Sequence, residues 1–284
     1  MRICDLFSHP DQQIDEALGK WGTMAALLGA GVTGLGAFSS GTGETPFMSP
    51  ISTAQAARLP SSAQPVTRTD ARNQVHANYP RELHHAKSMS PNDRVAAFQN
   101  AMVPLIRAEN ARIQDHRQRV RAIERNRSPS TQDQAWLNQK MAEYGATDVN
   151  SLMRRMDVIP VSLVLAQSAI ESGWGTDHIA RVGNSFFGQR AVRDQAHIPG
   201  PQGERYRSYE SPQHSVRSYM KNLNTHRAYE ALRAERAKLR RQGKTPTGAD
   251  LAVGLLSYST RGADYVQQVQ RLIRSRDLGR FDRN

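Results

Sequence analysis

The sequence predicts a mainly α-helical domain with a small β segment, preceded by a flexible N-terminal extension. Apolar residues recur at helical spacing over most of residues 94–284. The stretch 203–210 mixes aromatic and polar residues between turn formers, as a short strand does. Residues 46–93 are rich in Ser, Thr, Pro, Ala and Gln and contain few large apolar groups. With 284 residues, the chain can bury one full core and still carry an extension.

We therefore divide the chain into an N-terminal segment (1–45), a flexible tether (46–93) and a folded domain (94–284). Within the first segment, residues 21–38 carry no charge and are rich in Ala, Leu and Gly, with a length near the lower bound for a membrane span. A secretory signal or membrane anchor is the functional interpretation. The preceding twenty residues are net acidic, which is the wrong sign for the start of a signal peptide.

The domain is expected to open with two helices. An amphipathic run from Arg94 to Ile123 predicts the first, with Pro104 as a kink or boundary and Ser128-Pro129 as its end. A second apolar stripe begins at Trp136 and stops near Gly145.

The next predicted helix is apolar on nearly every side and ends in a carboxylate. Pro160 suits its first turn, and Gly173 is placed where a helix commonly leaves through a left-handed residue. Glu171 then emerges from the core at the C-terminal end of this helix. Loss of water and the negative end of the helix dipole both disfavour its ionised form, so its pKa should rise toward neutrality, as a general acid requires. The alternative is a local cap or salt bridge.

The residues after Glu171 predict a tightly turned loop beside the carboxyl, because glycines stand at 173 and 175 and again at both ends of the run 183–188. Trp174, Phe186 and Phe187 bring aromatic faces that suit a sugar ring. Core packing is the alternative for all three, and the one we favour for the two phenylalanines.

Beyond the short strand, helical patterns resume. Ser211-Pro212 starts a helix with an apolar face through Leu223, and a basic helix follows from Arg227 to Gln242. A capping box, Thr247-x-x-Asp250, then opens another helix. A last amphipathic run, through Ile273, predicts the final helix. The following leucines are expected to enter the core: Leu251, Leu255 and Leu256.

Three segments together resemble the glucosaminidases of glycoside hydrolase family 73. The first reads Ile-Pro-x-Ser-x-x-x-Ala-Gln-x-Ala-x-Glu-Ser-Gly-Trp-Gly, followed by Gly-Asn-x-x-Phe-Gly, within 157–188. The others are 209–229, opened by Tyr-Glu-Ser-Pro, and Tyr-Ser-Thr-Arg-Gly at 258–262. The match is most similar to the Bax branch of that family and extends over about 95–277.

The resemblance implies a lysozyme-like helical domain with a small β-lobe that cleaves the β-1,4 bond between N-acetylglucosamine and N-acetylmuramic acid in peptidoglycan. Glu171 matches the family's general acid. The family's cleft tyrosine, in a late Tyr-Ala-Thr-Asp-Pro-x-Tyr motif, falls on Tyr265, although this copy is one residue longer and lacks Asp-Pro. The following residues are expected on the substrate side: Trp174, Asn184, Phe187, Gly188 and Tyr258. For Tyr258, a packing role is the alternative.

The second catalytic group is less defined. Glycoside hydrolysis usually needs two carboxyl groups, and the apolar helix supplies one. We rank Glu204 first and Glu210 second; the alternative is that both are surface residues paired with Arg205 or Arg207. The resemblance also allows the substrate's acetamido group to act as nucleophile with help from a tyrosine, which leaves the stereochemistry open.

Charge and composition define the expected partners. The whole net charge of +12 lies in residues 95–284, with 30 basic and 18 acidic side chains. Such a domain is attracted to polyanions, among them peptidoglycan with its peptide carboxylates. We expect no nucleic-acid partner, because no recognition motif or basic-aromatic alternation is present. The single cysteine, Cys4, and the scattered histidines predict no metal and no cofactor.

We expect a location in the cell envelope or periplasm, by export or by anchoring through residues 21–38, with a phage virion as the alternative. Other functions kept open are a lytic transglycosylase or lysozyme-type muramidase, a non-catalytic wall-binding or virion assembly module, and a basic nucleic-acid-binding protein. The oligomeric state is left open.

Overall fold

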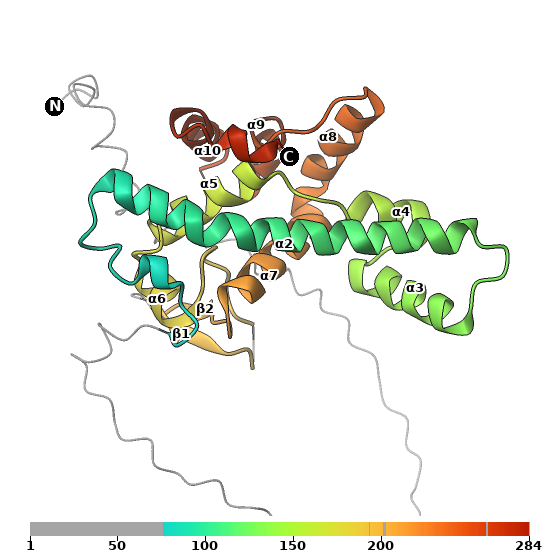
Figure 1. Cartoon of the computed structure of the whole chain (residues 1–284), viewed down its shortest axis with the longest axis horizontal. Coiled ribbons are helices and arrows are strands. Elements are labelled where there is room, and N and C mark those ends of the chain that lie inside the picture. Colours follow the sequence, from blue (N-terminus) through green and yellow to red (C-terminus); the bar gives the residue numbers. More distant parts are fainter. Residues whose placement is uncertain (1–75, 193, 201–202, 260, 284) are drawn as a thin grey trace, which may run out of the picture. The chain divides into compact units, whose positions relative to one another are not determined.

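The computed structural model describes residues 76–283 except 193, 201–202 and 260. This part is mainly helical with one two-stranded sheet, which confirms the predicted fold class (Figure 1). The elements in chain order are η3 (Arg81–Leu83), α2 (Pro91–Arg125), α3 (Thr131–Tyr144), α4 (Val149–Arg155), α5 (Val161–Ser172), α6 (His178–Gly183), β1 (His197–Pro199), β2 (Arg205–Arg207), α7 (Pro212–Thr225), η4 (Arg227–Tyr229), α8 (Glu230–Arg241), α9 (Gly248–Leu251), η5 (Ala252–Leu255), α10 (Ala263–Ser275) and η6 (Leu278–Asp282).

Helix α2 runs the length of the view in Figure 1, with α3 packed beside its later turns. Ser90 caps it, accepting a hydrogen bond from the Asp93 amide, and Pro91 occupies the first turn. Of the two alternatives for Pro104, a kink or a boundary, the boundary is wrong, because one helix continues through that residue. A proline inside a helix costs about 3 kcal/mol. Burial of Met102 and Ile106 on either side of it offsets that cost.

Helix α5 lies at the centre of the core, where it packs against α2, α9, α10 and η6. All of its residues are buried. It begins at Val161, with Pro160 as the N-cap rather than within the first turn. Asp282 of η6 supplies the missing cap, because its carboxylate accepts from the Ser162 amide at 2.8 Å and from the Ser162 hydroxyl at 2.6 Å. Gly173 ends the helix at φ +54°, as the sequence predicts.

A small β-lobe follows α5. Strands β1 and β2 are antiparallel, with Ile198 opposite Tyr206, and α6 packs against β1. The sequence predicts β2 but not β1, whose three residues bury only one side chain. Helix α6 also stands where only a loop is expected. Gly183 lets the lobe sit close to α6, since a Cβ there would lie 1.9 Å from Cδ1 of Ile198.

The C-terminal helices follow the predicted order with two differences. The basic helix begins with a separate 3-10 turn, η4, before α8. The helix opened by Thr247 lasts four residues and passes into η5. Because the 3-10 turn changes the angular step between side chains, Leu251 and Leu255 are buried while Leu256 is 56% exposed. The prediction that Leu256 enters the core is therefore wrong.

The folded domain begins before residue 94. Tyr79, Leu83 and Ala86 belong to the same hydrophobic core, and the Tyr79 hydroxyl donates to the carbonyl of Gly175. The part 76–93 of the predicted tether therefore packs against the domain through these apolar side chains. The sequence suggests a tether because the rest of the segment is polar. The anchor-like stretch 21–38 falls outside the described residues. Among the helices that the structure describes, none is long and apolar enough to cross a membrane.

Candidate active site

Glu171 is the carboxylate at the end of the buried helix. It is the second-last residue of α5 and is 2% exposed. The turn behind it is fixed by the Ser172 hydroxyl, which donates to the Ser168 carbonyl and accepts from the Gly175 amide at 2.9 Å. The backbone that carries the carboxyl is thus held from both sides.

A chain of hydrogen bonds ends on this carboxyl. The Tyr265 hydroxyl donates to Oε1 of Glu171 at 2.8 Å. Gln167, one turn earlier on α5, donates through Nε2 to the Tyr265 oxygen at 3.1 Å. Tyr219 of α7 donates in turn to Oε1 of Gln167. All four side chains are buried, and they come from three helices.

The direction of this chain decides which oxygen of Glu171 carries a proton. Tyr219 has its hydroxyl on the amide oxygen of Gln167, so the amide nitrogen faces Tyr265. The Tyr265 oxygen receives that N–H and directs its own proton toward Oε1. When Glu171 is neutral, its proton therefore lies on Oε2.

Burial raises the pKa of Glu171 from 4.5 to about 8, because the charged form loses its water. The hydrogen bond from Tyr265 and the positive charge of Arg261 act in the opposite direction and limit the rise. Burial also raises the pKa of both Tyr265 and Tyr219 well above its usual range, so both stay neutral donors. Burial therefore favours the protonated form of Glu171 at neutral pH.

A short loop covers the second oxygen. Gly188 has φ +59°, and a Cβ there would lie 3.6 Å from Oε2 of Glu171. Phe187 is buried and stacks on Tyr219, with ring centroids 3.9 Å apart. The half-buried Tyr258 stacks on Tyr265 with centroids 5.1 Å apart and donates to the Phe187 carbonyl at 3.2 Å. Gly188 thus lies beside the carboxyl, while Phe187 and Tyr258 pack on the two tyrosines of the hydrogen-bond chain.

Two other residues expected on the substrate side are buried in this structure. Trp174 is buried and meets Phe98 edge-on, with centroids 5.5 Å apart. Asn184 is buried at the end of α6 in a left-handed conformation, φ +51°, and donates to the Tyr209 carbonyl at 3.2 Å. Asn184 therefore ties α6 to the segment after β2. Neither side chain lies on a surface that a sugar can reach in this structure, and for Trp174 this is the packing alternative.

The two candidate second carboxylates have separate partners. Oε1 of Glu204 lies 3.6 Å from a guanidinium nitrogen of Arg190. Burial raises the pKa of the Tyr206 hydroxyl, and the negative charges of Glu204 and Glu171 both raise it further. Glu210 is 87% exposed and pairs with His214 at 3.4 Å. The group in direct contact with Glu171 is a tyrosine.

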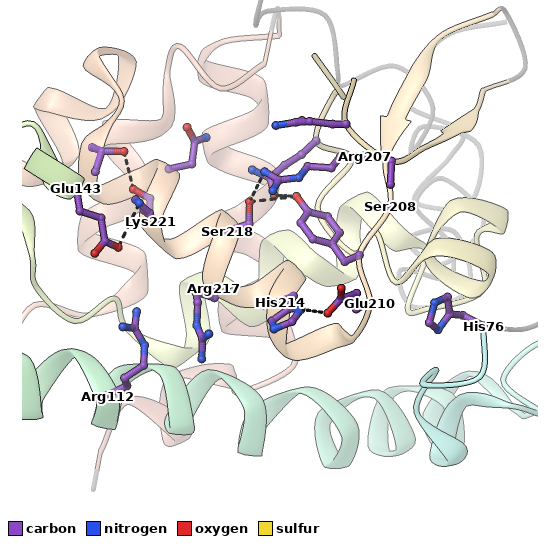
Figure 2. A pocket seen from close by; sticks show the side chains of 16 residues that line it. His76, Arg112, Glu143, Arg207, Ser208, Glu210, His214, Arg217, Ser218 and Lys221 are labelled. Atoms are coloured by element: carbon purple, nitrogen blue, oxygen red, sulfur yellow. Dashed lines mark hydrogen bonds and ion pairs between the residues drawn. The ribbon is translucent and has the colours of Figure 1, made fainter. Parts of the chain in front are cut away.

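A groove of about 990 Å³ runs along α7 (Figure 2). Gln189, the neighbour of Gly188, lines its wall and accepts a hydrogen bond from Tyr209 at 2.6 Å. The groove therefore borders the loop that covers Glu171. Among the residues the structure describes, no group of three His, Cys, Asp or Glu side chains could hold a metal ion.

The sequence interpretation missed Gln167 and Tyr219. Gln167 has a usable signal, because it is the only amide in the apolar run 161–170 and lies one turn before Glu171. Tyr219 has none, since its position on α7 fits an ordinary apolar stripe.

A buried carboxyl with a raised pKa beside a tyrosine, on a helical domain with a β-lobe, is an arrangement suited to a glycoside hydrolase. Residues 146–278 match the family model described as glucosaminidase, mannosyl-glycoprotein endo-beta-N-acetylglucosaminidase. The chain is 33% identical over 202 residues to protein Bax of Escherichia coli strain K12, covering 66% of this chain and 74% of that protein. The chain belongs to this glucosaminidase family and is a peptidoglycan hydrolase of the endo-β-N-acetylglucosaminidase type.

The solved structures include a weaker match. The catalytic domain of the autolysin Auto from Listeria monocytogenes is 18% identical, with a TM-score of 0.34, and the match covers 58% of this chain and 96% of that domain.

Proposed function

We propose that Glu171 is the general acid of a glucosaminidase that cleaves the β-1,4 bond between N-acetylglucosamine and N-acetylmuramic acid. The observation that carries the proposal is the hydrogen bond from Tyr265 to Oε1 of a carboxyl whose pKa is raised to about 8. A neutral acid near its working pH can give a proton to a leaving oxygen and take one back afterwards.

Oε2 of Glu171 protonates the glycosidic oxygen as the bond to the anomeric carbon breaks. Because Oε1 is engaged by Tyr265, the proton has one orientation, toward the side of Gly188. The glycosidic oxygen must come within hydrogen-bond distance of Oε2. At 2% exposure that contact requires the loop with Phe187 and Gly188 to move aside when substrate enters.

Two routes can complete the reaction. The substrate's acetamido oxygen can attack the anomeric carbon, with a tyrosine hydroxyl near Glu171 polarising it; Tyr258 and Tyr265 support this route by position. Alternatively, Glu204, which pairs with Arg190, activates a water as general base. The first route retains the anomeric configuration and the second inverts it.

The test is reducing-end analysis of fragments that the purified protein releases from peptidoglycan, with Glu171→Gln as control. We expect reducing N-acetylglucosamine ends from the parent and at least 100-fold fewer from the variant, since a general acid contributes about 10²–10⁴-fold. Reducing N-acetylmuramic acid ends would identify a muramidase, and anhydro ends a lytic transglycosylase. No fragments from the parent would leave a non-catalytic wall-binding module. Proton NMR of the first product gives the anomeric configuration.

We propose that the protein reaches the wall by export or anchoring through residues 21–38. The support is the uncharged stretch together with a substrate that lies outside the cytoplasmic membrane. Fractionation of cells that express the full chain tests this, because recovery only in the cytosol would exclude both routes.

A further inference from the structure

The groove along α7 carries an excess of fixed positive charge. Its walls come from α2, α3 and α7, from β2 with the residues just after it, and from residues 189 and 195–196 before β1, as Figure 2 shows for the labelled side chains. Four arginines and lysines line it: Arg112, Arg207, Arg217 and Lys221. The carboxylates in the lining are Glu143 and Glu210.

Two carboxylates hold these cations without neutralising them. Glu109, whose side chain is 1% exposed, binds Arg112 at 2.5 Å and Arg217 at 3.2 Å. One negative charge thus fixes two guanidinium groups, and one positive charge is left over. Glu109 is buried, and both guanidinium groups that it binds belong to residues that line the groove.

The same arrangement recurs one turn along α7. Glu143 of α3 binds Lys221 at 3.2 Å and Lys140 at 2.7 Å, so it also pairs with two cations, of which Lys221 lines the groove. Successive turns of α7 place Arg217 and Lys221 on one face, about 6 Å apart along the helix. The groove therefore presents cations at regular intervals rather than at one point.

Arg207 forms the opposite wall. Its Nη1 donates to the Ser218 hydroxyl at 3.2 Å, and its guanidinium lies over the Tyr209 ring, 4.9 Å from the centroid. These contacts fix the charge of β2 across from α7. They also cover the face of Tyr209 nearest Arg207, so that face is closed to a stacked base.

Two pairs of sequence neighbours connect the groove to the proposed catalytic site. Gln189 lines the groove, while the adjacent Gly188 lies against Glu171. Ser218 lines the groove, while the adjacent Tyr219 belongs to the hydrogen-bond chain that ends on Glu171. If a polymer binds at Glu171, a side branch of that polymer can therefore extend into the basic groove.

We propose that this groove binds the carboxylates of the stem peptide of peptidoglycan while the glycan strand occupies the site at Glu171. The inference rests on the proposed function, because it assumes a glycan strand at that site. A stem peptide is a short extended branch with several carboxylates, which matches a row of cations beside the cleft. A single-stranded nucleic acid also carries regular charge but needs exposed aromatic faces, and Arg207 occupies that of Tyr209.

The test measures binding rather than cleavage, in the Glu171→Gln background, so that the substrate survives. Soluble glycan strands with their stem peptides are compared with the same strands after an amidase has removed the peptides. The variant Arg217→Gln/Lys221→Gln removes two groove cations and leaves Glu109 and Glu143 paired with Arg112 and Lys140. The control Arg119→Gln/Lys238→Gln removes two cations from exposed pairs outside the groove.

At physiological salt we expect the groove variant to bind intact strands about three- to tenfold more weakly than the parent, the size of two partly exposed charge contacts. Binding of stripped strands should be equal for all proteins, and the control should match the parent. The difference should shrink as salt is raised. Equal affinity of the parent for intact and stripped strands would overturn the inference, as would a control that loses as much as the groove variant.

An oligonucleotide arm separates the two kinds of polyanion. If single-stranded DNA displaces intact strands from the parent at equal charge concentration, the groove is a general anion trough and the proposed specificity is wrong. The catalytic proposal is tested separately, with protein that keeps Glu171. If that proposal fails, this protein releases no new reducing ends from peptidoglycan. The binding comparison keeps its meaning in that case.

Discussion

Tyr265 of α10 and Glu171 of α5 are joined by a hydrogen bond of 2.8 Å across 94 positions of sequence. The tyrosine donates, so it stabilises the ionised carboxylate more than the neutral acid and partly opposes the effect of burial. The contact thus sets two properties of Glu171 together: the orientation of its acidic proton and the pH at which that proton is lost.

Replacement of Tyr265 by phenylalanine should separate these properties. The pKa of Glu171 should rise further, since the hydrogen bond that lowers it is gone, and the alkaline limb of the pH–rate profile should move to higher pH. We expect kcat to fall about tenfold, because Oε1 is no longer fixed, and stability to fall by about 1–3 kcal/mol, because Nε2 of Gln167 loses its acceptor. A fall in kcat with no movement of the alkaline limb would contradict the assigned contact.

The stability of the protein should depend on the charge of Glu171. Its pKa is raised from 4.5 to about 8, so between these values the folded protein binds a proton that the unfolded chain has released. Stability from this group is complete below pH 4.5 and is lost as pH rises through 8. Glu171→Gln removes the dependence. The variant should therefore gain in Tm relative to the parent from pH 5 to pH 8, by an amount that reflects a few kcal/mol. Parallel Tm curves over that range would show that burial does not hold the proton.

Gln167 should act through Tyr265 as a positioning residue. Gln167→Met keeps the volume but removes both amide contacts, so the Tyr265 hydroxyl can turn away from Glu171; we expect kcat to fall about tenfold with little change in KM. Gln167→Glu retains an acceptor for Tyr219 and, when protonated, a donor to Tyr265, so activity should return in part at acidic pH. The neighbouring Ser168→Ala, which loses only a bond to the Leu165 carbonyl, is the matched control.

Gly188 should be intolerant of a side chain for two reasons that a control can separate. Its φ of +59° costs an alanine about 1 kcal/mol, and the added Cβ would touch Oε2 of Glu171. Gly243 has φ +70° and nothing within 4 Å of an added Cβ. Both alanine variants should lose similar stability in denaturant titrations, and only Gly188→Ala should lower kcat/KM. An equal effect on kcat/KM would mean that Gly188 acts through the backbone alone.

Elements with long, strongly periodic patterns could be predicted from the sequence, and short ones could not. Helix α5 is set by its apolar run between Pro160 and Gly173. By contrast, α6 and β1 have six and three residues, too few for a period to be visible, and they exist because Ile179, Ile198 and Tyr206 pack together. Leu256 is also mispredicted because of a short element: the 3-10 turn η5 changes the direction of its side chain and leaves it exposed to solvent.

The sequence by itself determined the family, the central helix and the identity of Glu171 as its buried carboxyl, because local pattern and motif are properties of neighbouring residues. Only the tertiary structure decided that Tyr265, Gln167 and Tyr219 form one chain on that carboxyl, and that Trp174 packs inside. The reason is physical: a hydrogen bond depends on distances of a few tenths of an ångström between residues far apart in the chain, and the packing of α5, α7 and α10 fixes those distances.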